Sequence, residues 1–193
     1  MALVGAVLCG GASRRMGRDK ALLPVDGVAL ARRVADALVG GGCTTVLAVG
    51  GDGPALAALG LTPVPDRWPG EGPLGGLATA LAAVAGPEAP GAPGGEGDRM
   101  VLAPCDLLHP ALATVADLLA GLEGVDAVAV RAGERVQWLP SAWRVTGALA
   151  DRVAGLVARG DRRLDAVAPV VDHRVVVLVP DRVADADTPA DLP

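Results

Sequence analysis

Short apolar runs alternate with amphipathic segments along this chain of 193 residues, and this alternation limits the possible folds more than any other feature. Residues 2–8 are uninterrupted Ala, Leu, Val and Gly, which is typical of a strand buried on both faces. Further on, Leu30, Val34 and Leu38 recur at helical spacing with charged residues between them. Strands that alternate with helices predict an α/β fold in which helices flank a central, mainly parallel sheet.

The same patterns give the expected elements. Strands are predicted at 2–8, 45–49, 61–64, 100–103, 127–130, 136–143 and 174–179. Helices are predicted at 28–40, 54–59, 77–84, 110–122 and 147–158, with a last one opening at Thr188.

One stretch, residues 86–98, interrupts the pattern with Pro, Gly and Glu. A further strand is predicted directly after it, so we interpret it as a disordered surface loop rather than a linker between domains. A length of 193 residues fits one domain, and we expect a single domain over residues 1–193.

Charge and cysteine content exclude several classes of protein. A net charge of −5 argues against non-specific nucleic-acid binding, and no apolar stretch is long enough for a membrane span. The three cysteines, Cys9, Cys43 and Cys105, form neither a CxxC pair nor a disulfide framework. We therefore expect a cytoplasmic protein in a reducing compartment.

The candidate motifs follow three of the predicted strands. In open parallel sheets ligands bind beyond the carboxyl ends of the strands. The loops after Leu8, Val64 and Ala103 are therefore expected to lie together.

The first of these loops combines glycines with a concentration of positive charge. Residues 14–20 hold four basic side chains and one acidic side chain, a net charge of +3. Lys20 is the only lysine of the chain, which suggests a task for a compact ammonium that a planar guanidinium does not perform. Glycine backbone N–H groups approach phosphate oxygens closely, so the loop predicts a di- or triphosphate site, although neither the Walker A nor the GxGxxG pattern is present.

This segment resembles the signature LxGGxSxRMGxDKxLL of the molybdopterin nucleotidylyltransferase family. The matching residues are Leu8, Gly10, Gly11, Ser13, Arg15, Met16, Gly17, Asp19, Lys20, Leu22 and Leu23. Further motifs follow in the family's order, so the resemblance extends from Leu3 to Leu192. It implies a single-domain Rossmann-like nucleotidyltransferase fold.

The second and third loops are weak signals when taken alone. Residues 72–76, GPLGG, are an ordinary turn sequence, and Asp106 is as well suited to capping a helix as to binding Mg²⁺. The resemblance implies that Asp66 and residues 72–76 line the nucleotide pocket and that Asp106 carries the metal. The family usually has Pro two residues after this aspartate, where this chain has Leu108.

The resemblance thereby implies a complete set of site residues. The nucleotide-binding residues would be Leu8, Cys9, Gly10, Gly11, Ser13, Lys20, Asp66, Gly72, Pro73, Leu74, Gly76 and Asp106. The catalytic residues would be Arg15, Lys20 and Asp106, and the cofactor would be Mg²⁺ on Asp106.

Two further motifs are open to structural explanations. Asp187 resembles a second metal residue of the family, and an Asp-Thr-Pro sequence is also a plain helix start. Arg135 and Gln137 resemble acceptor-binding residues, and a solvated strand edge explains them equally well. We interpret His109 and His173, which stand alone, as surface or capping residues.

The implied reaction transfers GMP from GTP to the terminal phosphate of Mo-molybdopterin and releases pyrophosphate. A phosphate monoester is largely ionised at neutral pH, so no general base is needed. Gly10 and Gly11 favour guanine, whereas Asp187 is typical of cytidylyl-transferring relatives. The alternatives are a cytidylyltransferase for the same pterin, a guanylyltransferase for another phosphorylated acceptor, and a non-catalytic pterin carrier. Molybdoenzymes or their chaperones are the implied protein partners, without nucleic acid or membrane.

Overall fold

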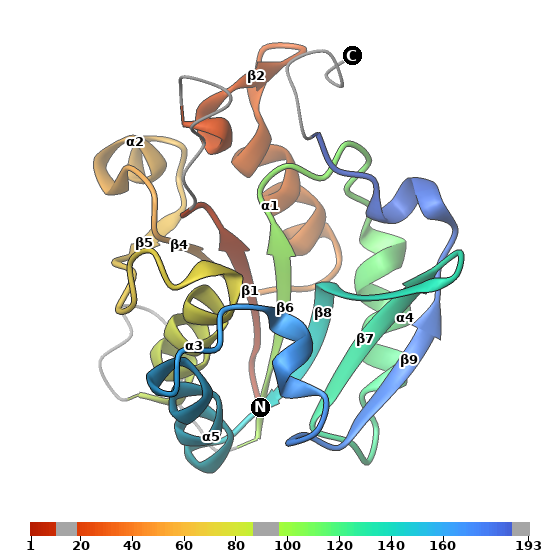
Figure 1. Ribbon diagram of the computed structural model, residues 1–193. Coiled ribbons are helices and arrows are strands. Elements are labelled where there is room, and N and C mark those ends of the chain that lie inside the picture. Colours follow the sequence, from red (N-terminus) through yellow and green to blue (C-terminus); the bar gives the residue numbers. More distant parts are fainter. Residues whose placement is uncertain (11–18, 87–96, 187–193) are drawn as a thin grey trace.

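A mixed sheet of seven strands forms the centre of the protein (Figure 1). The computed structural model describes residues 1–10, 19–86 and 97–186. Within them the strands follow the spatial order β5-β4-β1-β6-β8-β7-β9. Their bounds are β1 (Leu3–Leu8), β4 (Thr45–Val49), β5 (Thr62–Val64), β6 (Asp98–Pro104), β7 (Ala127–Ala132), β8 (Arg135–Val145) and β9 (His173–Val177). Only β8 runs antiparallel to its neighbours, so the expected α/β fold with a mainly parallel sheet is confirmed.

Helices cover both faces of the sheet because the strands are apolar on both sides. On one face lie α3 (Gly72–Ala85) and α5 (Gly147–Ala158), and on the other α1 (Leu30–Gly40) and α4 (Leu112–Gly121). Successive side chains of β1 alternate between the two layers: Val4 packs with the α3 side and Val7 with the α1 side. The short α2 (Gly53–Ala58) packs beside the edge strand β5.

The structure corrects several expected bounds. Residues 28–29 were expected in the first helix, but Val28–Ala29 form β3, which pairs with β2 (Pro24–Val25) across a tight turn. Asp26 and Gly27 in this turn have φ values of 51° and 79°. Of the loop expected at 86–98, residues 87–96 lie outside the described residues. Asp98 was expected in that loop but is the first residue of β6, where it is buried and its Oδ1 accepts a hydrogen bond from Ala2 N at 2.7 Å. The helix expected at Thr188 lies outside the described residues.

Three short 3₁₀ helices complete the described chain and were not predicted. They are η1 (Lys20–Leu22), η2 (Leu164–Val167) and η3 (Pro180–Val183). No helix in the described ranges is long and apolar enough to cross a membrane.

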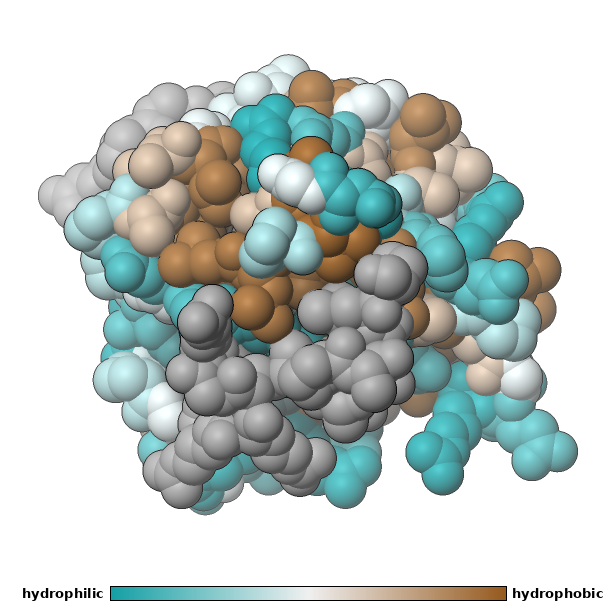
Figure 2. Space-filling model, turned by 90° about the horizontal axis from the view of Figure 1, so that it is seen from above, coloured by the Kyte–Doolittle hydropathy of each residue, from teal (hydrophilic) through white to brown (hydrophobic). Residues whose placement is uncertain are grey.

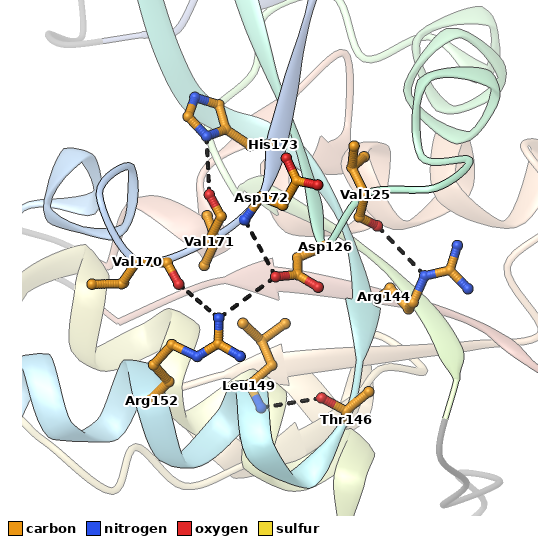
Figure 3. A network of polar contacts seen from close by, with 10 residues as sticks. All are labelled: Val125, Asp126, Arg144, Thr146, Leu149, Arg152, Val170, Val171, Asp172 and His173. Atoms are coloured by element: carbon orange, nitrogen blue, oxygen red, sulfur yellow. Dashed lines mark hydrogen bonds and ion pairs between the residues drawn. The ribbon is translucent and has the colours of Figure 1, made fainter.

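A polar network fastens the amino ends of β7 and β9 to α5 (Figure 3). Arg152 donates to the Val170 carbonyl at 2.7 Å and lies 3.6 Å from Asp126, whose carboxylate also accepts from the Asp172 N–H. Next to it His173 is half-buried, with its ring centroid 5.1 Å from that of Trp138. The network holds the edge of the sheet opposite to the carboxyl ends of the parallel strands.

Candidate active site

The carboxyl ends of four parallel strands meet at one edge, where their loops are hydrogen-bonded to one another. Cys9 and Gly10 both donate their N–H groups to the Val49 carbonyl, at 2.9 and 3.0 Å. Gly50 N donates to Val64 O at 2.9 Å, and Cys105 N donates to Leu8 O at 3.2 Å. The three motif-bearing loops therefore lie together as the strand order predicts.

A cleft of about 740 Å³ opens between the loops that follow β1, β4 and β5. Its lining includes Gly10, Gly50, Gly51, Asp66 and Gly72, and does not include Lys20 or Asp106. Seen from above, this end of the molecule carries groups of hydrophobic residues among hydrophilic ones (Figure 2). The volume is within the range of small-molecule sites, and the glycines expose backbone groups to whatever binds there.

Gly50 is required where it stands. Its φ is +72°, and a Cβ there would lie 2.8 Å from the Cα of Gly10. This second glycine segment, residues 50–53, was not among the predicted site residues. The signal was present, because glycines directly follow a predicted strand as they do after Leu8.

Asp66 reaches the cleft with one oxygen while the other is held by the protein. Its Oδ1 accepts from Trp68 N at 3.0 Å and lies 3.0 Å from Thr79 Oγ1. A Cβ on Gly10 would lie 3.8 Å from Asp66 Oδ2, so this second oxygen faces the glycine loop. The fully buried Thr79 also accepts from Arg67 N at 3.1 Å, and nothing in its sequence context separates it from an ordinary core residue of α3.

The GPLGG motif forms the first turn of α3 rather than the loop expected from its glycines. Pro73 suits this place because the first helical residues need no N–H donor. Gly72 has a φ of +70°, and a Cβ on it would lie 2.8 Å from the Arg162 carbonyl, which accepts from Leu74 N at 3.2 Å. Of the predicted residues in this motif, Gly72 lines the cleft, whereas the Leu74 side chain is buried in the core.

Core packing also accounts for three other predicted nucleotide residues. A Cβ on Gly76 would lie 2.8 Å from Leu8 Cδ2, so Gly76 lets α3 approach β1 closely. Cys9 is buried on the α1 side of the sheet. The packed core beneath the loops thus includes Leu8, Cys9 and Gly76.

Lys20 and Asp106 form an ion pair at the same edge, 86 residues apart in the sequence. Lys20 Nζ lies 2.5 Å from Asp106 Oδ2, and each side chain is 15% exposed. Lys20 opens η1, which Asp19 caps by accepting from Ala21 N at 3.0 Å. The structure thus joins the only lysine of the chain to the aspartate expected to bind metal.

The backbone around Asp106 is held by the C-terminal part of the described chain. Ala186 N donates to Asp106 O at 3.0 Å, and Leu108 N donates to Ala184 O at 2.9 Å. A proline at position 108, the residue usual in the resembling family, has no N–H for the second bond. Leu108, where the Asp-x-Pro pattern has proline, therefore allows a strand-like contact between this loop and residues 184–186.

Several predicted residues are not brought into contact with this pair. Arg135 is exposed and Gln137 half-buried near the start of β8, at the same edge but on the other side of β6 from the cleft. Gly11, Ser13, Arg15 and Asp187 lie outside the described residues.

The donor set suits a magnesium ion that is shared with a phosphate ligand. The described ranges contain no group of three metal-ligating side chains. Mg²⁺ keeps several waters and is commonly held by one or two carboxylates together with substrate phosphates. The Asp106 carboxylate already holds a cation, the Lys20 ammonium, so its position fits that role.

The cysteines close to the site are free, buried thiols. Burial, with a smaller contribution from the Asp19 carboxylate, raises the pKa of Cys9 to about 12. Burial likewise raises the pKa of Cys105 well above its usual value. Both thiols are therefore protonated and unreactive at neutral pH.

Comparison with known proteins identifies relatives over the whole chain. The family model described as "MobA-like NTP transferase domain" matches residues 5–175. A protein of Mycobacterium marinum named "Probable molybdenum cofactor guanylyltransferase" is 33% identical over 199 residues, covering 100% of this chain and 92% of that protein.

Solved structures share the fold. Molybdopterin-guanine dinucleotide biosynthesis protein A from Archaeoglobus fulgidus superposes with a TM-score of 0.70 at 20% identity, covering 98% of this chain and 94% of that one. A Mycobacterium tuberculosis protein, Rv0371c, solved in complex with manganese, gives a TM-score of 0.69 at 21% identity, with coverage of 99% and 96%.

Proposed function

The chain belongs to the MobA-like NTP transferase family, and from that premise we propose that it transfers GMP from GTP to the terminal phosphate of Mo-molybdopterin. The family assignment makes the protein a nucleotidyltransferase of molybdenum cofactor biosynthesis. The nucleotide, the acceptor and the metal are the parts that we propose. We further propose that it acts in the cytoplasm and delivers its product to molybdoenzymes or their chaperones.

The observation that carries the proposal is the Lys20–Asp106 pair, which lies at the same end of the sheet as the glycine-lined cleft. A cation and a carboxylate at the carboxyl edge of a parallel sheet are the groups that a nucleoside triphosphate and its metal need. A protein that only carries a pterin has no use for a polyphosphate site.

The reaction forms one P–O bond and breaks another. A terminal phosphate oxygen of the acceptor attacks the α-phosphorus of GTP, and the bond between that phosphorus and the oxygen bridging to the β-phosphate breaks. The attacking phosphate is already ionised, so the protein has to position the two phosphates and neutralise charge. Lys20, and by resemblance Arg15, would stabilise the negative charge that grows on the departing pyrophosphate.

Asp106 would hold Mg²⁺, and Asp187 is a second candidate for that ion. When bound, the ion neutralises phosphate charge. Ala186, the residue before Asp187, donates its N–H to the Asp106 carbonyl.

The glycine loop supports guanine as the base. Gly10 backs onto Gly50, and Asp66 Oδ2 faces the space that a side chain at position 10 would enter. A carboxylate accepts hydrogen bonds, and guanine presents two adjacent donor groups, N1–H and its 2-amino group, where cytosine presents only its 4-amino group. Arg135 and Gln137 stay proposed acceptor contacts, since they lie at the same edge beyond β6.

Two measurements test the proposal. In thermal-shift titrations with Mg²⁺, GTP is expected to stabilise the protein by about 2.7 kcal/mol at 100 times its Kd, and CTP by less. Pyrophosphate release is expected only when molybdopterin is also present. A larger shift with CTP would favour the cytidylyltransferase alternative, and binding without pyrophosphate release would favour the carrier.

A further inference from the structure

The Lys20 ammonium lies beside the Asp106 carboxylate, in the position of a bound cation. Nζ lies 2.5 Å from Oδ2, and both side chains are only 15% exposed. The ammonium leaves other lone pairs of the carboxylate unused, because each carboxylate oxygen has two. A divalent ion on the same carboxylate would nevertheless lie close to the ammonium and be repelled by its charge.

The structure indicates which partner moves. Two hydrogen bonds hold the backbone around Asp106. Ala186 N donates to the Asp106 carbonyl, and the preceding residue, Cys105, donates its N–H to the Leu8 carbonyl. Lys20 is anchored by the buried Ala21 and the Asp19 cap of η1, but its ammonium sits on a flexible four-carbon stem. The stem can swing while both backbones stay in place.

We propose that Lys20 acts as an internal counter-ion that keeps divalent metal off Asp106 until a nucleotide arrives. The inference rests on the proposed function, because it takes Asp106 as the metal residue. The negative charge of the polyphosphate draws the ammonium away from the carboxylate, which frees Oδ2 for the metal. Metal and nucleotide then bind together, and the empty protein holds metal weakly.

A lysine suits this exchange better than an arginine. An ammonium is a point charge that can pass from a carboxylate to a phosphate, whereas a guanidinium tends to hold a carboxylate with two parallel bonds. The exchange thus gives a physical reason for the single lysine of an arginine-rich chain.

The test is a titration with Mn²⁺ alone, in which binding is measured as the loss of the electron paramagnetic resonance signal of the free ion. Wild-type protein is compared with Lys20→Gln, Lys20→Arg and the double variant Lys20→Gln/Asp106→Asn. We expect Lys20→Gln to bind Mn²⁺ about 10-fold more tightly than wild type, a difference of about 1.4 kcal/mol. Lys20→Arg keeps the positive charge and is expected to stay as weak as wild type.

Arg32→Gln is the matched control, because Arg32 also forms an ion pair with an aspartate, Asp36, within α1. This variant also removes one positive charge from an ion pair with an aspartate, but in α1 and not at Asp106. It is expected to leave the Mn²⁺ affinity unchanged. If Lys20→Gln does not give a cooperative melting transition, Lys20→Met takes its place.

Three outcomes would overturn the inference: no tightening in Lys20→Gln, equal tightening in Lys20→Arg, or tightening that survives in the double variant. The titration contains neither nucleotide nor pterin, so it is independent of product formation. Wild-type product without tightening in Lys20→Gln would refute the inference alone. Tightening in Lys20→Gln without any wild-type product would refute the proposed function alone.

Discussion

Thr79→Val removes a hydroxyl that the structure connects to the nucleotide cleft through Asp66. The substitution keeps the shape of the fully buried side chain. It takes away the 3.1 Å bond from Arg67 N and the single hydroxyl proton, which Asp66 Oδ1 at 3.0 Å and the Gly75 carbonyl at 2.9 Å share. Asp66 would then keep the bond from Trp68 N, so its second oxygen would be oriented less firmly toward the cleft.

The magnitudes follow from the number of bonds lost. Two hydrogen bonds at roughly 0.5–1.5 kcal/mol each predict a loss of about 1–3 kcal/mol in unfolding free energy. For a chain of this size that is a fall in Tm of about 2–12 °C. We also expect the KM for the nucleotide to rise about 10-fold with kcat little changed, because Asp66 would contact the nucleoside and not the reacting phosphates.

Thr79→Ser separates positioning from packing. Serine keeps the hydroxyl and loses one buried methyl group, which costs about 0.8 kcal/mol of stability. Steady-state kinetics and thermal melts of both variants form the assay. A raised KM in Thr79→Val that Thr79→Ser restores is the expected result. Equal KM values in wild type and Thr79→Val, or equal defects in both variants, would refute the positioning role.

Three other changes are expected to give distinct results. Lys20→Arg and Lys20→Ala should each lower kcat by about 10²–10³-fold, since one preorganised charge donor is lost, and wild-type kinetics in Lys20→Arg would remove the argument for the lone lysine. Gly10→Ala should fold, because its Cβ would meet Gly50 Cα at 3.4 Å, but it should weaken GTP binding in thermal-shift titrations; unchanged binding would show that position 10 does not face the base. Replacing residues 87–96 by a short Gly-Ser turn should preserve Tm and activity while Asp98 is retained, and a large drop in Tm would mean that the segment packs.

The alternation of apolar runs and helical spacing predicted the layered architecture because both signals are local. The central strand β1 and the helix α5 were predicted almost to the residue for this reason. The GPLGG segment was misjudged, since glycine is a poor helix former and the need for it is not local: Gly76 stands where α3 packs against Leu8. The β2–β3 hairpin was missed because each strand has only two residues.

The location of the site could be predicted from the sequence, whereas most of its contacts could not. Ligands bind beyond the carboxyl ends of parallel strands, and this rule predicted that the loops of Lys20, Asp66 and Asp106 lie together. The ion pair between Lys20 and Asp106 spans 86 residues, and the sequence contains no signal for that pairing. The role of Thr79 could not be predicted either, because a threonine in an apolar helix is indistinguishable by sequence from an ordinary core residue. Only its contact with Asp66 in the structure separates the two.

Mass analysis of the product tests the central claim most directly. The wild-type protein is incubated with Mo-molybdopterin, Mg²⁺ and each of the four nucleoside triphosphates in turn, with Asp106→Asn as the control. We expect the guanine dinucleotide form of the cofactor with GTP, little product with CTP, and none from the variant. A cytosine dinucleotide as the main product, no dinucleotide at all, or equal product from Asp106→Asn would contradict the account.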